Sequence, residues 1–227
     1  MKKSVRLSAV IFFVFLSATV LAQYPSVTFF GGANMATTDV KFGSVNTDIE
    51  DTFKPLYGMN IGALYEYVLN KDKSQEIAVE GGLIFENKGF HQKLEEPSYS
   101  HKNKTTLYFI DVPAYLKYIY RFRSLNKIYV GAGGFVGAGL FGNESITFQY
   151  EGADPTSNSE SVNWGSEGDY QRLDYGVSGK IGFLSHRGLN ICVSYDHGFA
   201  DIATLETEEA KTRVFRLSLG YTLRLDD

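Results

Sequence analysis

The feature that most constrains the fold is an alternation of apolar and polar residues that recurs along the chain after residue 22. The clearest example runs from Arg172 to Phe183, where Leu173, Tyr175 and Val177 alternate with polar or glycine positions. Successive side chains of a β-strand point to opposite faces, so this period of two predicts a strand with one apolar face. The same pattern predicts eight strands, near residues 26–34, 59–67, 76–86, 108–121, 128–141, 172–183, 189–196 and 215–224.

The connections between these strands alternate between short and long. Three are short, at residues 70–74, 122–127 and 184–188, and four are longer, at residues 35–56, 91–104, 142–170 and 198–211. Eight antiparallel strands whose two ends lie on one side need three turns on that side and four loops on the other. Short periplasmic turns and long extracellular loops are typical of small outer-membrane barrels. The sequence therefore predicts an all-β, eight-stranded, antiparallel up-and-down transmembrane barrel.

The alternation alone does not say whether the apolar face points outward to lipid or inward. Several strands reach ten residues, which is the length that a tilted strand needs to cross a bilayer. Tyrosines gather near the ends of the apolar faces, as interfacial aromatic residues do. The opposite face carries charges of both signs that can pair inside a narrow barrel: Glu66, Glu80, Asp111, Lys117, Arg172, Asp174, Lys180 and Arg216. These observations favour the membrane barrel over a secreted, soluble, lipocalin-like ligand binder.

The first 22 residues have the pattern of a secretory signal peptide. Lys2, Lys3 and Arg6 precede an uncharged apolar run from Ala9 to Leu21, and small residues stand before Gln23. We expect cleavage after residue 22 and a single barrel domain at residues 23–227. Without those three basic residues, 19 of the 22 Lys and Arg remain against 26 Asp and Glu, which gives a net charge of −7. This acidic balance argues against nucleic-acid binding.

Several segments together resemble a known family. Asp111–Tyr118 (DVPAYLKY) and Ile128–Gly134 (IYVGAGG) are followed in order by Asp174–Gly182 (DYGVSGKIG), Tyr195–Ile202 (YDHGFADI) and Arg216–Leu223 (RLSLGYTL). In order and spacing they resemble the PorT-type outer-membrane β-barrel proteins of Bacteroidetes, over most of residues 23–227.

The resemblance implies an eight-stranded barrel in the cell outer membrane. It also implies a structural, interaction or secretion-associated role in the envelope, without a catalytic motif, cofactor or metal. The expected partners are outer-membrane lipid, the barrel-assembly machinery and envelope or secretion proteins. One departure concerns the C-terminus, because outer-membrane barrels usually end on an aromatic residue, whereas this chain ends Leu225-Asp226-Asp227. That ending puts the efficiency of membrane insertion in question.

The densest glycine run, Tyr129–Gly142, does not fit a dinucleotide-binding motif. The pattern G-x-G-x-x-G fails because Val136 stands where the last glycine is required. The run instead has period two, with Gly131, Gly133, Gly137 and Gly139 on one face together with Tyr129, Phe135 and Phe141. We expect this face to line the barrel interior and to leave room for long charged side chains from neighbouring strands.

Two loop features suggest binding chemistry without fixing it. The connection 142–170 carries Glu144, Glu151, Asp154, Glu160, Glu167 and Asp169 and contains no Lys or Arg before Arg172. Clustered carboxylates can bind Ca²⁺, but the spacing of an EF-hand is absent, so a solvated acidic loop is the favoured interpretation. Asn143-Glu144-Ser145 matches the short and common glycosylation sequon.

The alternative of an outer-membrane rim enzyme, acting on lipid or protein, depends on His197. It stands beside Asp196 and near Ser194, but strand parity puts Ser194 and Asp196 on one face and His197 on the other. A catalytic triad needs the three groups within reach of one another, so this parity argues against a local triad. His91, His101 and His186 fall in predicted loops or turns without metal-ligand spacing.

Interior charges could in principle line an ion path. The interior of an eight-stranded barrel is only wide enough to be filled by side chains, so we expect a plug of ion pairs rather than a pore. Cys192, the only cysteine, falls on this interior face. Pro113 lies inside a predicted strand and removes a ladder hydrogen bond, so we expect a bulge or bend there rather than a gating hinge.

Overall fold

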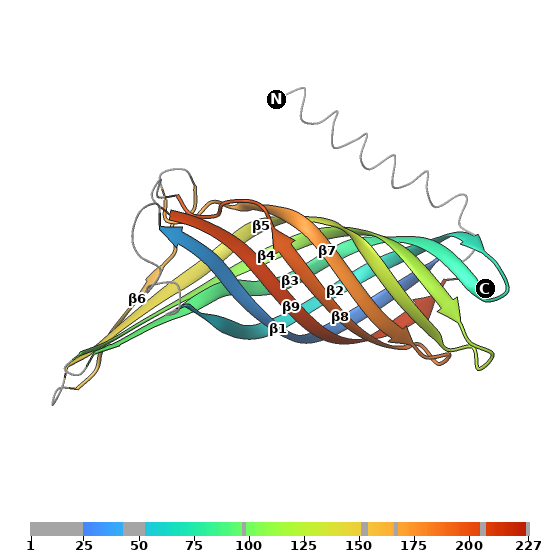
Figure 1. Ribbon diagram of the computed structural model, residues 1–227, viewed down its shortest axis with the longest axis horizontal. Coiled ribbons are helices and arrows are strands. Elements are labelled where there is room, and N and C mark those ends of the chain that lie inside the picture. Colours follow the sequence, from blue (N-terminus) through green and yellow to red (C-terminus); the bar gives the residue numbers. More distant parts are fainter. Residues whose placement is uncertain are drawn as a thin grey trace, which may run out of the picture.

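The computed structural model of the chain describes residues 25–42, 53–96, 99–150, 154–165, 168–204 and 208–225. These residues form an elongated barrel of strongly tilted strands (Figure 1). The strands are β1 (Ser26–Phe42), β2 (Phe53–Lys71), β3 (Gln75–Glu96), β4 (Tyr99–Arg121), β5 (Lys127–Tyr150), β6 (Thr156–Ser161), β7 (Leu173–Leu184), β8 (Leu189–Gly198) and β9 (Glu208–Arg224).

Eight of the strands close into a ring. The hydrogen-bonded order is β4-β3-β2-β1-β9-β8-β7-β5, and β4 also pairs with β5, which removes both edges. Every pairing between these strands is antiparallel. Ser26 at the start of β1 pairs with Arg224 at the end of β9, so the first and last strands meet at the end that carries the short turns. The predicted eight-stranded, up-and-down barrel is thus confirmed.

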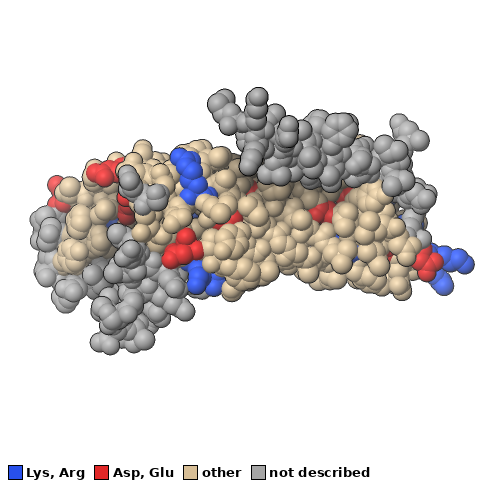
Figure 2. Space-filling model, turned by 90° about the horizontal axis from the view of Figure 1, so that it is seen from above, with Lys and Arg blue, Asp and Glu red and all other residues tan. Residues whose placement is uncertain are grey.

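The apolar face of each strand points outward. Along β7, Leu173, Tyr175, Val177 and Ile181 are exposed, whereas Asp174 and Lys180 on the opposite parity are buried. The middle of the barrel surface is accordingly almost free of charge in Figure 2, and Lys, Arg, Asp and Glu gather toward its two ends. A soluble ligand-binding barrel would have the reverse arrangement, so the lipocalin-like alternative is wrong. Among the described residues, no helix is long and apolar enough to span a membrane.

The strands on the loop side are longer than the sequence pattern predicted. β3 and β4 stay paired from Gln75 and Tyr120 to Glu96 and Tyr99, so the expected loop 91–104 is a hairpin. β5 likewise continues to Tyr150, and β6 pairs with its outer part, so much of the expected loop 142–170 is strand. These segments are polar on both faces, which hides the period-two signal. They form the projection at the left of Figure 1.

Two single-residue expectations are wrong for reasons of register. A shift between Tyr108 and Phe109 pairs Phe109 with Gly139 and Tyr108 with Phe141, which leaves Leu140 as the extra residue of a bulge. Phe141 is therefore exposed rather than interior. Arg172 precedes β7 and is also exposed, with its guanidinium bonded to the Gly139 carbonyl (2.9 Å) outside the lumen.

Pro113 causes no bulge of its own. Named pairs between β3 and β4 stop at Gly81↔Ala114 and resume at Ile84↔Asp111 in the same register. The local pairing is interrupted but the strand is not shifted. The missing donor of proline is tolerated here, and the nearby bulge lies in β5, where Leu140 is the extra residue opposite Tyr108 and Phe109.

Some expectations fall on residues that the structure does not describe. The expected signal peptide at residues 1–22 and the two final acidic residues lie outside the described ranges. Glu151 and Glu167 of the acidic connection lie outside them as well. These expectations therefore stay predictions.

Candidate functional site: the charged barrel lumen

A first group of charges lies across the lumen toward the end with the short turns. Lys117 of β4 bonds Glu66 of β2 (2.5 Å) and Glu80 of β3 (2.7 Å), and Lys180 of β7 pairs with the second oxygen of Glu80. All four side chains are at least nine-tenths buried. The Lys117 ammonium also lies 4.1 Å from the centre of the Tyr129 ring. The neighbouring strands β2, β3 and β4 are thereby joined through the interior to β7, which lies beyond β5 in the ring.

A second and larger group lies nearer the loop end. Arg216 of β9 makes a two-pronged contact with Glu86 (2.5 and 3.0 Å) and also pairs with Asp196. Lys88 of β3 contacts Asp111 and Asp174, each at 2.8 Å. These six side chains are nearly inaccessible to solvent. Because a buried charge must be paired or hydrogen-bonded, the group is stable only as a whole.

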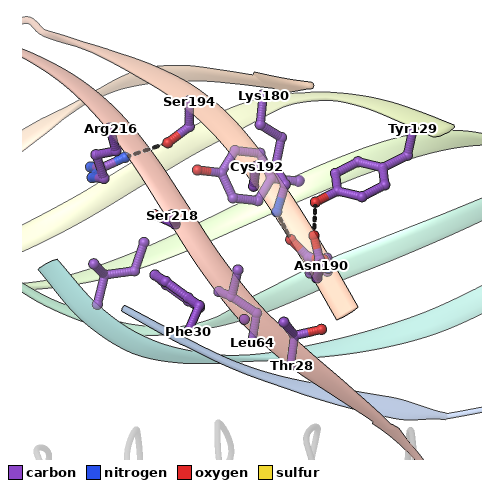
Figure 3. A pocket seen from close by; sticks show the side chains of 14 residues that line it. Thr28, Phe30, Leu64, Tyr129, Lys180, Asn190, Cys192, Ser194, Arg216 and Ser218 are labelled. Carbon is purple, nitrogen blue, oxygen red and sulfur yellow. Dashed lines mark hydrogen bonds and ion pairs between the residues drawn. The ribbon is translucent and has the colours of Figure 1, made fainter. Parts of the chain in front are cut away.

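Hydroxyl and amide groups fill the remaining polar positions between the charges. Ser178 donates to Asp196 and shares a 2.8 Å hydrogen bond with Tyr115. Tyr129 donates to Asn190 (2.7 Å), and Arg216 donates to Ser194 (3.1 Å), both drawn in Figure 3. The space left among these side chains is about 30 Å³, enough for one or two water molecules.

Apolar clusters lie above and below the charges. Val68, Ala78, Ile119, Tyr129 and Leu184 pack together near the short turns. Leu107, Phe109, Val162, Ile202 and Ala210 pack at the loop end, where Trp164 meets the edge of Phe109 at 5.7 Å between ring centres. Segments around Val162 and Ile202 therefore close the mouth of the barrel. The described lumen is filled by ion pairs between two apolar layers, as expected for a plug rather than a pore.

The glycine face of β5 makes room for this filling, as the sequence predicts. A Cβ at Gly137 would lie 2.0 Å from the Asp111 carboxylate, and one at Gly131 would lie 3.1 Å from both Lys117 and Lys180. A Cβ at Gly139 would lie 2.2 Å from the Trp164 ring. The glycines of the run leave space inside the barrel.

Three carboxylates of the upper group have the spacing of metal ligands. Oxygens of Glu86, Asp111 and Asp196 lie within 4.8 Å of one another. Lys88 and Arg216 contact these same carboxylates, so each of the three already has a cationic partner. The residues therefore fit an internal ion-pair network better than a metal centre.

The candidate catalytic residues are not brought together. Asp196 is buried against Arg216 and Ser178, and Ser194 bonds Arg216. His197 points to the other face, where its ring contacts Tyr195 and Phe199 at 6.4 and 5.5 Å between centres. The parity argument is confirmed: these residues form no triad with one another.

Sequence reasoning placed most of the interior charges but missed several. Glu66, Glu80, Asp111, Lys117, Asp174, Lys180 and Arg216 are buried in the lumen as expected. Glu86, Lys88 and Asp196 were missed as members of the interior network, although each shares strand parity with a predicted interior residue. A third group, Glu76 with Arg121 and Lys127, lies near the short turns.

Comparison with known proteins identifies the family. Residues 21–204 match the outer membrane protein beta-barrel domain family. The chain belongs to this family. It is therefore an outer-membrane β-barrel protein, and its localisation in the outer membrane agrees with the apolar outer face. A comparison with curated proteins gives no match.

Solved structures that match the chain include three bacterial proteins. Ail, the attachment invasion locus protein of Yersinia pestis, is 18% identical, with a TM-score of 0.36 over 87% of this chain and 98% of that chain. OprG of Pseudomonas aeruginosa is 14% identical, with a TM-score of 0.40 over 88% and 96%. Neisserial surface protein A is 14% identical, with a TM-score of 0.34 over 86% and 96%.

Proposed function

We propose that this outer-membrane barrel is a non-catalytic structural or interaction protein of the cell envelope, with a lumen that conducts no solute. The observation that carries the proposal is the filled interior, where cross-barrel ion pairs leave a cavity of about 30 Å³. A barrel whose interior is filled by side chains acts through its outer surface and its loop-side projection. The described residues offer neither a passage nor an assembled nucleophile and base.

The resemblance to PorT-type proteins of Bacteroidetes supports a more specific proposal, a role associated with protein secretion or maturation at the cell surface. Its support is the order of the five quoted segments along residues 111–223. Under this proposal the working parts are the extracellular extensions of β3 to β6, which project beyond the rest of the barrel (Figure 1). The barrel itself serves as an anchor of fixed shape.

Conductance in a planar lipid bilayer tests the closed lumen. We expect purified, folded protein to show no stepwise ion conductance across the range of voltages that the bilayer tolerates. A double variant that shortens two filling side chains, Lys117→Ala with Tyr129→Ala, is the matched positive control, because it removes both groups from the centre of the lumen. Stable wild-type channels would refute the closed-lumen proposal.

A deletion strain of the source bacterium tests the envelope role. We expect the deletion to change the set of proteins displayed at the cell surface, as measured by surface labelling and mass spectrometry. Complementation with wild type and with His197→Ala should restore it equally, because His197 lies away from Ser194 and Asp196. A loss of complementation by His197→Ala, together with altered lipid A, would favour the enzyme alternative.

A further inference from the structure

A groove of about 890 Å³ is lined by residues of β1 to β5, where the apolar band gives way to the loop-side extension. Its apolar part is formed by Tyr57, Met59, Ile61, Phe85 and Tyr108, and its polar part by Asn87, Lys104, Thr106 and Asn143. Met59, Tyr57 and Ile61 are exposed by 78%, 76% and 62%, more than any other large apolar side chains in the described ranges. The groove is thus open, apolar at one end and polar at the other.

The groove results from an irregularity in β2. The register between β2 and β3 shifts between Pro55 and Asn60, where β2 carries one extra residue. Asn87 accepts a hydrogen bond from the Met59 backbone N–H (2.8 Å). Gly58 permits this, because a Cβ there would lie 2.0 Å from the Asn87 side chain. The bulge holds the Met59 region in a fixed conformation beside β3.

Positive side chains stand in rows at the polar end of the groove. Across three strands, Lys54 pairs with His91 and His91 with Lys104, and the next outward row pairs Lys93 with Lys102. Cations directly opposite on neighbouring strands repel each other, so this arrangement costs stability. Burial, followed by the four lysine charges, lowers the pKa of His91 below its ordinary value. That shift agrees with the crowding of positive charge seen in the register.

Among the residues that line the groove, Lys104 is the only charged side chain. Beyond the aromatic residues Phe85, Tyr108 and Phe141, the outward positions from Asn87 to Lys93 in β3 and from Ser100 to Thr106 in β4 carry only lysine, histidine, glycine, serine, threonine and asparagine. Lys54 and Lys104 make no ion pair within the described residues. Glu144 lies on the other face and bonds Asn103 (2.6 Å). The outward face beside the groove is therefore positive.

The position of the rows matches the level of lipid head groups. Lys104 lies four residues beyond Tyr108 along β4, which is roughly 13 Å at the rise of a strand and about 10 Å along the barrel axis for a tilt of ~40°. Interfacial aromatic rings mark the edge of the hydrocarbon, and the polar layer extends roughly 5–7 Å beyond it. The long side chain of Lys104 can reach back over this distance. The cations thus lie above the apolar part of the groove, at phosphate depth.

We propose that this groove binds a phosphate-bearing glycolipid of the outer leaflet. An acyl chain lies against Met59, Ile61 and Phe85, and a phosphate lies between Lys54 and Lys104. Those two lysines are separated by two strand spacings, about 10 Å between Cα atoms, so both ammonium groups can reach one phosphate or a neighbouring pair. Asn87, Thr106 and Asn143 add neutral polar contacts at the rim. The phosphate offsets the repulsion within the cationic rows.

Native mass spectrometry of the purified, folded full-length protein in detergent tests the proposal. The probes are bisphosphorylated lipid A, the same lipid A after removal of its phosphates, and inorganic phosphate. Wild type is expected to bind the bisphosphorylated lipid tightest. Lys54→Gln with Lys104→Gln is expected to weaken it about tenfold, the loss that follows from removing charge-assisted hydrogen bonds. The matched control, Lys73→Gln with Arg123→Gln in the short turns, is expected to bind like wild type.

A second variant separates a lipid from a free anion. Thr106→Phe fills the groove without changing charge, so it is expected to weaken lipid A but not inorganic phosphate. Equal wild-type binding of the two lipids, or unchanged binding in the double lysine variant, would overturn the proposal. The proposal would also be overturned if inorganic phosphate bound as tightly as lipid A and the Thr106→Phe variant still bound the lipid. Heat-modifiable migration on a gel confirms that each variant is folded before it is scored.

Discussion

The lower ion-pair group allows a quantitative test of the filled lumen. Lys117 is 3% exposed and bridges Glu66 and Glu80, and Glu80 keeps a second partner in Lys180. Lys117→Met keeps the length of the side chain but removes its charge, and it leaves Glu66 buried with no cation in contact. Removing one partner of a buried pair costs about 3–5 kcal/mol of unfolding free energy. We therefore expect Lys117→Met to lower the free energy of unfolding by about 3–5 kcal/mol.

The double variant Lys117→Met with Glu66→Gln separates the pair from other effects of the substitution. The double variant also removes the unpaired charge of Glu66. Its loss of unfolding free energy should therefore be smaller than the sum of the losses of the two single variants, with a coupling free energy of about 1–3 kcal/mol. The assay is urea unfolding and refolding in lipid vesicles, followed by the fluorescence of Trp164 and by heat-modifiable migration. A lumen filled by paired charges without water would be refuted if Lys117→Met lowered the unfolding free energy by less than about 0.5 kcal/mol. It would also be refuted if the effects of the two substitutions added within about 0.5 kcal/mol.

Two further expectations follow from particular contacts. Gly137→Val should destabilise the barrel by about 1–3 kcal/mol in the same urea assay, because its Cβ would collide with Asp111. Gly179→Ala should leave the stability unchanged, since nothing lies within 4 Å of a Cβ there. Equal effects of the two substitutions would contradict the packing of the lumen. The pKa of His91, measured by NMR, should lie below its ordinary value and should rise in Lys104→Gln, because a repelling charge is removed. A lowered histidine pKa means that the unfolded chain binds more protons than the folded chain. The contribution of His91 to stability is therefore present above the ordinary histidine pKa and is lost as the pH falls below it. An unchanged His91 pKa in Lys104→Gln would contradict the crowding of positive charge.

The barrel and its lumen could be predicted from sequence because period two is strong where one face meets lipid. Leu173 to Phe183 shows the strand and its two faces. Strand length, the interfacial tyrosines and the charges of both signs then placed the face of Lys180 inside. The same rule failed where a single residue changed the register. The bulge at Leu140 turned Phe141 outward, and Arg172 stood just before its strand began. Neither the bulge nor the start of the strand changes the local alternation of apolar and polar residues.

The strands of the loop-side extension could not be predicted from the apolar–polar alternation, for a different reason. In water both faces of a strand can be polar, so Lys93, Lys102 and Ser145 look like loop residues although they are paired across neighbouring strands. The groove was missed for the same reason, since its lining comes from five strands that are far apart in sequence. Only the register shows that Lys54, His91 and Lys104 form one row.

Site-directed spin labelling tests the central claim most directly. In a Cys192→Ser background, single cysteines from Tyr175 to Phe183 would carry a nitroxide in protein reconstituted in bilayers. Collision with lipid-soluble oxygen should then peak at the odd positions 175, 177, 179, 181 and 183 and fall at the even positions, where Ser178 and Lys180 are buried. Oxygen access that peaked at the even positions, or showed no period of two, would contradict a membrane barrel with an apolar exterior and a charged, closed interior.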